Sequence, residues 1–168
     1  MHNLAAQLAL STLLVSITVV MHLVGLGVLR RLVRLHLERF LILVHLDRVI
    51  VPLGVVLGLF VVHGAEIWMY ALTYELMGLT NTLEDALFIS TSSYSTIGEA
   101  AGLMPADWRL VGVLEGVNGM LLIGWSTAFL FQLLDHLMHD EEEAEAQRGA
   151  ISRRRRARKP DGSAGQGG

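Results

Sequence analysis

The run Ser95-Thr96-Ile97-Gly98-Glu99 carries residue types that could bind a cation stripped of its water. Thr96 offers a hydroxyl and a carbonyl oxygen, and Gly98 can adopt the positive φ angle at which successive carbonyls point at one axis. We therefore expect Thr96, Ile97 and Gly98 to form the core of a cation-binding segment, with Thr96, Gly98 and Glu99 as ligands. Such a tripeptide is a weak motif by itself, so its meaning depends on the elements that position it.

Glu99 admits two interpretations. If several copies of the chain surround one axis, the Glu99 side chains form a carboxylate ring that concentrates cations and binds divalent ions. The alternative is a carboxylate that is hydrogen-bonded behind the cation-binding segment as a structural brace. Both remain open on the sequence alone.

Four polar side chains in apolar segments are candidates for supporting this segment: His63, Glu66, Glu115 and Asn118. His63 and Glu66 lie about one helical turn apart, so they share a face. A metal pair is conceivable, but two ligands are too few unless other subunits contribute, so we expect a buried hydrogen-bonded pair. An ionisable group such as Glu115 inside an apolar segment is a functional candidate by default. The sequence does not identify its partner, and the candidates are Arg109, Ser92 and Ser93.

Three long apolar segments must position these residues. The chain has 168 residues, of which 52% are hydrophobic and 17% charged, which is more apolar than a soluble domain of this size. A helix needs about 20 apolar residues to cross a hydrocarbon core of roughly 30 Å. Leu4–Leu29 contains no Asp, Glu, Lys or Arg and lacks the flanks of a signal peptide, so we expect a retained transmembrane helix. The other two spans are Val49 to about Leu72 and about Val111 to Leu134.

Between the second and third spans lies a short apolar run, Leu83–Tyr94, which reads as a helix of 12 residues. At about 1.5 Å per residue it reaches roughly 18 Å and cannot cross the bilayer, so it must be re-entrant or interfacial. Asn81 or Thr82 is the expected N-cap, and Glu84 and Asp85 place negative charge in the first turn, where the helix dipole favours it. Its C-terminal carbonyls would then point toward the membrane centre, which favours a cation there.

The distribution of positive charge predicts the topology. Of the 13 Lys and Arg residues, seven follow the third span, five separate the first two spans, and only Arg109 lies between the second and third. The positive-inside rule places the N-terminus outside and the C-terminus in the cytoplasm, as in an integral protein of the plasma membrane (the inner membrane of a bacterium). The chain has no cysteine, which excludes disulfides and thiol chemistry.

The C-terminal tail, residues 138–168, combines an acidic run (Asp140–Glu145) with a basic run (Arg153–Lys159). It lacks the apolar residues to build a core, so we expect it to be largely disordered beyond about Ala150. The basic run could contact anionic lipid headgroups, with a plain topology signal as the alternative. Nucleic acid is not an expected partner.

Residues 50–135 resemble the two-transmembrane pore-domain superfamily of tetrameric cation channels, which includes bacterial potassium channels. In that family an outer helix, a pore helix, a filter with the pattern Thr-Val-Gly-Tyr-Gly and an inner helix follow one another. The filter pattern is matched at Thr96, Ile97 and Gly98. The run Ser95 to Glu99 is most similar to the filter of cyclic-nucleotide-gated channels, which discriminate little among sodium, potassium and calcium. The departures from the potassium pattern are Glu99, Ala100 and Ala101.

The resemblance implies an all-α membrane protein with three transmembrane helices, a re-entrant pore helix and a filter loop, assembled as a homotetrameric pore. Its parts would be an N-terminal helix (1–29), a basic cytoplasmic connector (30–48), a pore domain (49–137) and the charged tail (138–168). Gly119 and Gly124 become candidate gating hinges, with close helix packing as the alternative role of each. The expected function is a nonselective or weakly selective cation channel. It would be no enzyme and would need no cofactor besides permeant monovalent cations, with Ca²⁺ as a further candidate.

Three alternatives remain open. Two belong to the same class: a potassium-selective channel with an altered filter, and a nonconducting regulatory subunit. The third is an intramembrane serine hydrolase, because Gly124-Trp125-Ser126 is similar to the Gly-x-Ser of rhomboid proteases. Its base would be His63 or His136, and nothing in the sequence matches the six-helix rhomboid scaffold.

Overall fold

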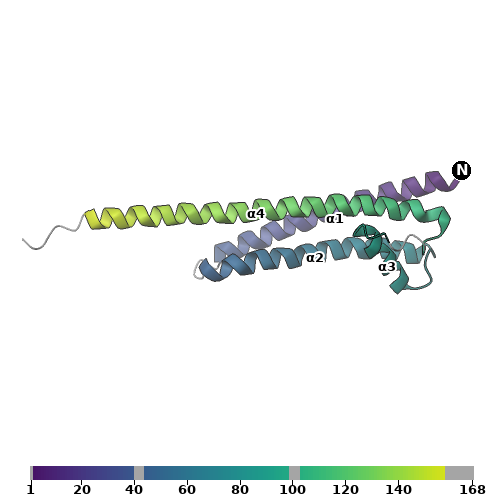
Figure 1. Cartoon of the computed structure of the whole chain (residues 1–168), viewed down its shortest axis with the longest axis horizontal. Helices are drawn as coiled ribbons and strands as arrows, with labels where there is room; N and C mark the ends of the chain where they lie inside the picture. The colour runs from purple at the N-terminus through teal and green to yellow at the C-terminus, as the bar shows by residue number, and fades with distance from the viewer. Residues whose placement is uncertain (1, 40–43, 99–102, 158–168) are drawn as a thin grey trace, which may run out of the picture. The chain divides into compact units, whose positions relative to one another are not determined.

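The computed structural model describes residues 2–39, 44–98 and 103–157, and every regular element in this part of the chain is helical. In chain order (Figure 1), the elements are α1 (His2–Arg39), α2 (Val44–Leu76), α3 (Leu83–Tyr94), the short 3₁₀ helix η2 (Ala106–Trp108) and α4 (Arg109–Ala157). The chain divides into two compact units, residues 1–130 and 131–168. The first 22 residues of α4 thus belong to the first unit, which holds all of the candidate site residues that the structure describes.

Three helices are long and apolar enough to cross a membrane, which confirms the membrane-protein class at the level of length and composition. The candidate spans are Leu4–His36, Val49–Leu76 and Ala106–Asp135, with 33, 28 and 30 residues. Large apolar side chains such as Phe60 and Val61, each 73% exposed, lie on the outer faces of the helices. Because exposing so much apolar surface to water is unfavourable, lipid is the natural solvent of these faces.

The first two helices are longer than the sequence pattern predicts. α1 continues through the first arginines of the expected connector to Arg39, and α2 begins at Val44 rather than at Val49. Most of the expected connector, residues 30–48, is therefore helical, and residues 40–43 lie outside the described residues. Leu and Arg are among the good helix formers, so charge alone does not end α1 where its apolar part ends.

α1 and α2 approach each other closely through glycine. A Cβ added to Gly25 of α1 would lie 2.6 Å from a methyl group of Val62, and a Cβ added to Gly58 of α2 would lie 2.2 Å from a methyl group of Leu29. Small residues at both contacts allow van der Waals packing between helices, which operates inside a bilayer where the hydrophobic effect does not. The two contacts fix the position of α1 against α2.

α3 begins and ends where the sequence predicts, at Leu83 and Tyr94. Of the two expected N-caps, Thr82 is the one used. Its hydroxyl accepts a hydrogen bond from the backbone N–H of Asp85 at 3.1 Å and donates to the Asp85 carboxylate at 2.8 Å. Glu84 and Asp85 lie in the first turn, where negative charge stabilises the helix dipole.

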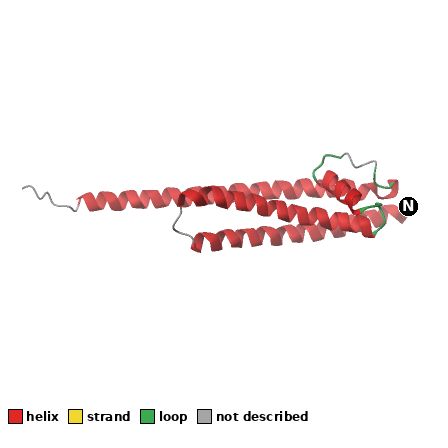
Figure 2. Cartoon of the chain, turned by 90° about the horizontal axis from the view of Figure 1, so that it is seen from below, coloured by secondary structure: helices red, strands yellow, loops and turns green. Residues whose placement is uncertain are grey.

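The core of the first unit lies where α3 packs among the long helices. Its buried apolar side chains come from all four helices and from the loop before η2: Leu14, Tyr70, Ala71, Tyr74, Ala86, Ile89, Met104 and Val111. Figure 2 shows the loops that flank α3 at the same end of the unit as the N-terminus of α1. α3 is thus held at one end of the first unit by apolar packing on several sides.

Replacing Thr82 by alanine should lower the free energy of unfolding by about 1 kcal/mol, because the Asp85 N–H loses its acceptor at the start of α3. Thr82→Ser keeps the capping hydroxyl and should stay close to the unmodified protein. Thermal unfolding of the detergent-purified chain compares the two variants. Equal melting temperatures for both would contradict the assignment of Thr82 as the cap.

α4 continues to Ala157, far beyond the end near Leu134 that was expected for the third span. We expected disorder beyond about Ala150, but the chain is helical as far as Ala157. Residues 158–168 lie outside the described residues. The sequence of this part of α4 is rich in Glu, Ala and Arg, whose helix propensity is high enough to form helix without a core. Contact between the basic run Arg153–Lys159 and anionic lipid stays a prediction.

Candidate functional site

The segment after α3 folds back on the end of that helix. Ser95 is the C-cap, and Thr96 follows with a φ angle of +62°. Four consecutive backbone N–H groups donate to carbonyls of the last turn: Ser95 to Thr91 at 3.0 Å, Thr96 to Ser93 at 2.9 Å, Ile97 to Ser92 at 3.0 Å and Gly98 to Ser92 at 3.2 Å. The bonds from Thr96 and Ile97 form a Schellman motif, which usually places glycine at the left-handed position.

The backbone of this segment holds an uncommon conformation. Thr96 is the one described residue other than glycine with a positive φ angle, and Gly98 has a φ of +77°. For a β-branched residue the left-handed conformation costs on the order of 1–2 kcal/mol. Strain of this kind persists only where the surrounding structure enforces it, and it is concentrated at functional sites.

The same hydrogen bonds fix the direction of the carbonyl groups. In a planar trans peptide, each carbonyl points opposite to the N–H of the next residue. Because the N–H groups of residues 96–98 face the end of α3, the carbonyls of Ser95, Thr96 and Ile97 point away from it. The segment is exposed, and the Ile97 side chain retains 66% of its accessible surface. The carbonyl oxygens of Ser95, Thr96 and Ile97 in the predicted cation-binding segment therefore point away from the end of α3.

The rest of the predicted filter follows Gly98. Glu99, Ala100 and Ala101 lie outside the described residues, so both interpretations of Glu99 stay open. Beside the described part, Thr96 and Gly98 line a groove of about 390 Å³ together with apolar side chains of α3 and α4, among them Ile89 and Val117. This groove leaves space next to the predicted cation-binding segment in the single chain.

Glycines of α4 receive the C-terminal end of α3. A Cβ added to Gly116 would lie 2.9 Å from the Ser93 carbonyl oxygen, and one added to Gly119 would lie 2.3 Å from the Tyr94 carbonyl oxygen. At Gly124 the position of a Cβ has nothing within 4 Å. Gly119 is therefore a close-packing position in the first unit, whereas Gly124 keeps the hinge hypothesis open.

Glu115 is fully buried, with partners other than those expected. Tyr74 of α2 and Ser90 of α3 both donate to its carboxylate, each at 2.5 Å. Ser90 is bonded instead of the candidates Ser92 or Ser93. The register of α4 against α3 places Glu115 beside Ser90, up to about one turn before those two serines along α3. The amide of Asn118, also buried, donates to Thr18 of α1 at 2.8 Å. These contacts tie α4 to the other three helices.

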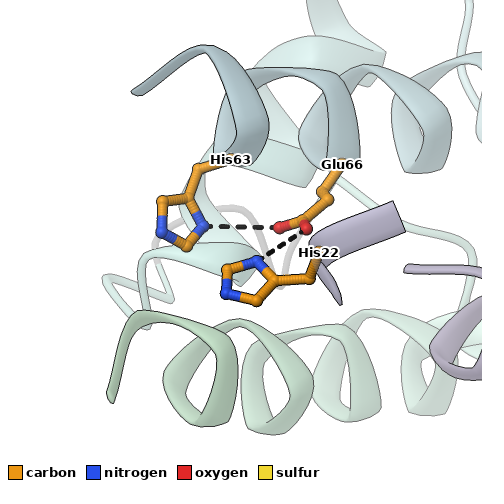
Figure 3. A group of neighbouring side chains, drawn as sticks. All are labelled: His22, His63 and Glu66. Carbon is orange, nitrogen blue, oxygen red and sulfur yellow. Dashed lines mark hydrogen bonds and ion pairs between the residues drawn. The ribbon is translucent and has the colours of Figure 1, made fainter. Parts of the chain in front are cut away.

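His63 and Glu66 belong to a larger group, which we name the histidine cluster: His22, His63, Glu66, Tyr94 and Ser126. The Glu66 carboxylate lies 2.9 Å from His22 Nδ1 and 3.3 Å from His63 Nδ1 (Figure 3). Tyr94 donates to the same carboxylate, and its hydroxyl lies 2.8 Å from His63 Nδ1. Ser126 Oγ lies 2.9 Å from His63 Nε2 and 3.3 Å from His22 Nε2. The cluster joins all four helices and reaches the last residue of α3.

The sequence identified His63 and Glu66 as a pair but gave no role to His22. A signal for it was present, because His22 is the one ionisable residue in the apolar run Leu4–Leu29. No local sequence pattern indicated the contacts of Tyr94 and Ser126. Tyr94 is 28 positions from its partner Glu66, and Ser126 is 63 positions from its partner His63.

No protein-family model, no curated protein and no solved structure matches this chain. The resemblance to tetrameric cation channels therefore stands on the motif and on its surroundings in the chain.

Proposed function

We propose that this chain is one subunit of a homotetrameric cation channel with weak selectivity among monovalent cations. The observation that carries the proposal is the direction of the carbonyls of Ser95, Thr96 and Ile97, away from the helix end that binds the N–H groups. The segment thus offers oxygen acceptors rather than N–H donors on its exposed side. In channels, rings of backbone carbonyl oxygens can replace the hydration shell of a cation.

The position of α3 supports the same function. Its C-terminal carbonyls meet α4 at Gly116 and Gly119, about two to three turns into that helix. The partial negative charge at a helix C-terminus favours a cation in a medium without bulk water. With the N-terminus outside and the C-terminus in the cytoplasm, as the positive charges predict, α3 would enter the plasma membrane from the outer side.

A pore requires several copies, because one such segment cannot enclose an ion. Thr96, Ile97 and Gly98 are exposed in the single chain, and the groove beside them is open. Covering a side chain as exposed as that of Ile97 in an assembly would remove apolar surface from water and stabilise the assembly. Fourfold symmetry follows the resemblance to tetrameric channels.

Weak selectivity is the expected consequence of the residues after Gly98. The outer carbonyl rings of a potassium filter need a backbone that alanine at position 100 disfavours, so fewer stacked rings should be available to discriminate between ions. A ring of Glu99 carboxylates would add attraction for sodium and for divalent ions such as Ca²⁺. We expect sodium and potassium permeabilities within about one order of magnitude of each other.

Recording from the purified chain in a planar bilayer, with sodium on one side and potassium on the other, tests this function. We expect a current that reverses near zero voltage, and native mass spectrometry should show four copies of the 18.4 kDa chain. Reversal at the potassium equilibrium potential would support the potassium-selective alternative. A stable tetramer without current would support the nonconducting subunit. A stable monomer or dimer would rule out the tetrameric pore.

One observation favours a second candidate, an intramembrane serine hydrolase. Three side chains are arranged as in a Ser-His-Glu triad. Ser126 Oγ lies 2.9 Å from His63 Nε2, and His63 Nδ1 lies 3.3 Å from the Glu66 carboxylate. Against it, Ser126 is only 4% exposed and lies inside α4, where the backbone N–H groups bond along the helix rather than to an oxyanion. His136, the other base considered, lies outside the described side chains. Covalent labelling of Ser126 by a fluorophosphonate would favour the hydrolase.

A further inference from the structure

We propose that His22, His63 and Glu66 form a binding site for a divalent transition-metal ion, with Zn²⁺ as the best match. One ligand atom from each residue lies within 4.8 Å of the other two. Two imidazole nitrogens and one carboxylate oxygen form a known zinc ligand set, with the fourth position left to water or another ligand. α1 supplies the third ligand that the pair on α2 lacks, so the site is complete within one chain.

The distances suit a small tetrahedral ion. Zinc lies about 2.0 to 2.2 Å from nitrogen and carboxylate ligands, which places neighbouring ligand atoms roughly 3.3 Å apart. Glu66 Oε1 lies 2.9 Å from His22 Nδ1, and Glu66 Oε2 lies 3.3 Å from His63 Nδ1. Figure 3 shows both rings turning Nδ1 toward this carboxylate. The three ligand atoms lie within 4.8 Å of one another, so side-chain rotation that draws them about 1.5 Å closer would bring them into coordination.

Ser126 completes the outer shell of the site. An ion bound at Nδ1 of both imidazoles leaves each ring with a proton on Nε2, which must donate to a partner. Ser126 Oγ lies 2.9 Å from His63 Nε2 and 3.3 Å from His22 Nε2, and a hydroxyl oxygen has two lone pairs to accept both bonds. One serine thus holds both ligand rings in the tautomer that the metal requires.

Burial separates this site from histidines that bind metal loosely at a surface. The side chains of His22 and Glu66 are 0% exposed, and that of His63 is 17% exposed. A bound ion would fasten α1 to α2 and, through the Tyr94 hydroxyl beside Glu66, would also restrain the end of α3. The site does not depend on whether the chain conducts ions, so its test uses metal binding and stability alone.

Titration of the purified 168-residue chain with Co²⁺ and Zn²⁺ tests the site. We expect one Co²⁺ per chain with the visible absorption of tetrahedral cobalt, loss of that absorption when Zn²⁺ is added, and a higher melting temperature with Zn²⁺ than with a chelator. His22→Ala and His63→Ala should abolish all three signals. His36→Ala, a histidine of α1 outside the cluster, should leave them unchanged. Ser126→Ala should weaken Zn²⁺ binding by about 10- to 100-fold without abolishing it.

A ligand exchange keeps the test decisive if the alanine variants fail to fold. His22→Cys puts a thiolate, another zinc ligand, into a chain without any cysteine, so a sulfur-to-cobalt charge-transfer band would report this position alone. The band should appear and should vanish with Zn²⁺. A folded His22→Cys protein without the band, metal binding that survives in His22→Ala, or no saturable binding by the unmodified chain would each overturn the proposal.

Discussion

Gly119→Ala should destroy the native packing between α3 and α4, with a loss of about 3 kcal/mol or more in the free energy of unfolding. The added Cβ would lie 2.3 Å from the Tyr94 carbonyl oxygen and 2.9 Å from its Cγ. Neither atom can move easily, because the carbonyl belongs to the end of α3 and the Tyr94 hydroxyl is bonded to Glu66. Thermal unfolding and size-exclusion chromatography of the detergent-purified protein measure the effect.

Gly124→Ala is the matched control on the same helix, because nothing lies within 4 Å of its added Cβ. Alanine is the better helix former, so the variant should be as stable as the unmodified protein or up to about 1 kcal/mol more stable. If Gly119→Ala unfolds at the same temperature as this control, the close approach of Tyr94 to α4 is wrong. A folded Gly124→Ala channel with altered opening would support Gly124 as a hinge.

If the chain conducts cations as proposed, Gly98→Ala should lower the conductance by about tenfold or more in a protein that still folds. Gly98 has a φ angle of +77°, and an L-residue pays on the order of 1–2 kcal/mol to hold such a conformation. Relaxation of that strain would turn the peptide between Ile97 and Gly98 and misdirect the Ile97 carbonyl. A change of about 1.4 kcal/mol at one ion site corresponds to a tenfold change in occupancy. Single-channel recording in a planar bilayer measures it.

Gly78→Ala separates strain from ion conduction. Gly78 lies in the loop between α2 and α3, has a φ angle of +68° and, like Gly98, has open space around an added Cβ. The two variants should therefore lose similar stability, while only Gly98→Ala should change conductance. Equal conductance losses would assign both effects to folding. Normal conductance and selectivity in Gly98→Ala would remove residues 95–98 from the ion path.

The elements that could be predicted are those whose limits are set by neighbouring residues. α3 is the clearest example, since the cap at Thr82 and the end at Tyr94 depend on interactions within a few positions of the chain. The three candidate spans were also predictable, because a run of about 20 apolar residues is typical of a helix that crosses a membrane. Their ends were not, since Arg-rich and Glu-rich segments continue a helix as readily as apolar ones do.

The contacts between helices could not be predicted from local patterns. Periodicity tells which face of α4 carries Glu115, but the residue that faces it depends on how far α4 slides along α3. The partners of Glu115 are Ser90 and Tyr74, which lie 25 and 41 positions away. The same holds for His22, whose partner Glu66 is 44 positions away on another helix. A single sequence gives the donors and acceptors of these pairs but not their register.

The long-range contacts of α1 bear on how the protein is made. Gln7 accepts a hydrogen bond from the backbone of Leu110, Thr18 from Asn118, and His22 Nε2 lies beside Ser126, so the partners are separated by 103, 100 and 104 positions. The ribosome therefore releases α1 long before its partners on α4 exist, into a hydrocarbon phase that supplies none. The polar contacts of α1 with α4 can form only after the last helix has been made, whereas its contacts with α2 can form earlier. The packing of residues 1–130 is therefore completed late, and a nascent chain arrested before position 118 would lack the hydrogen bond between Thr18 and Asn118.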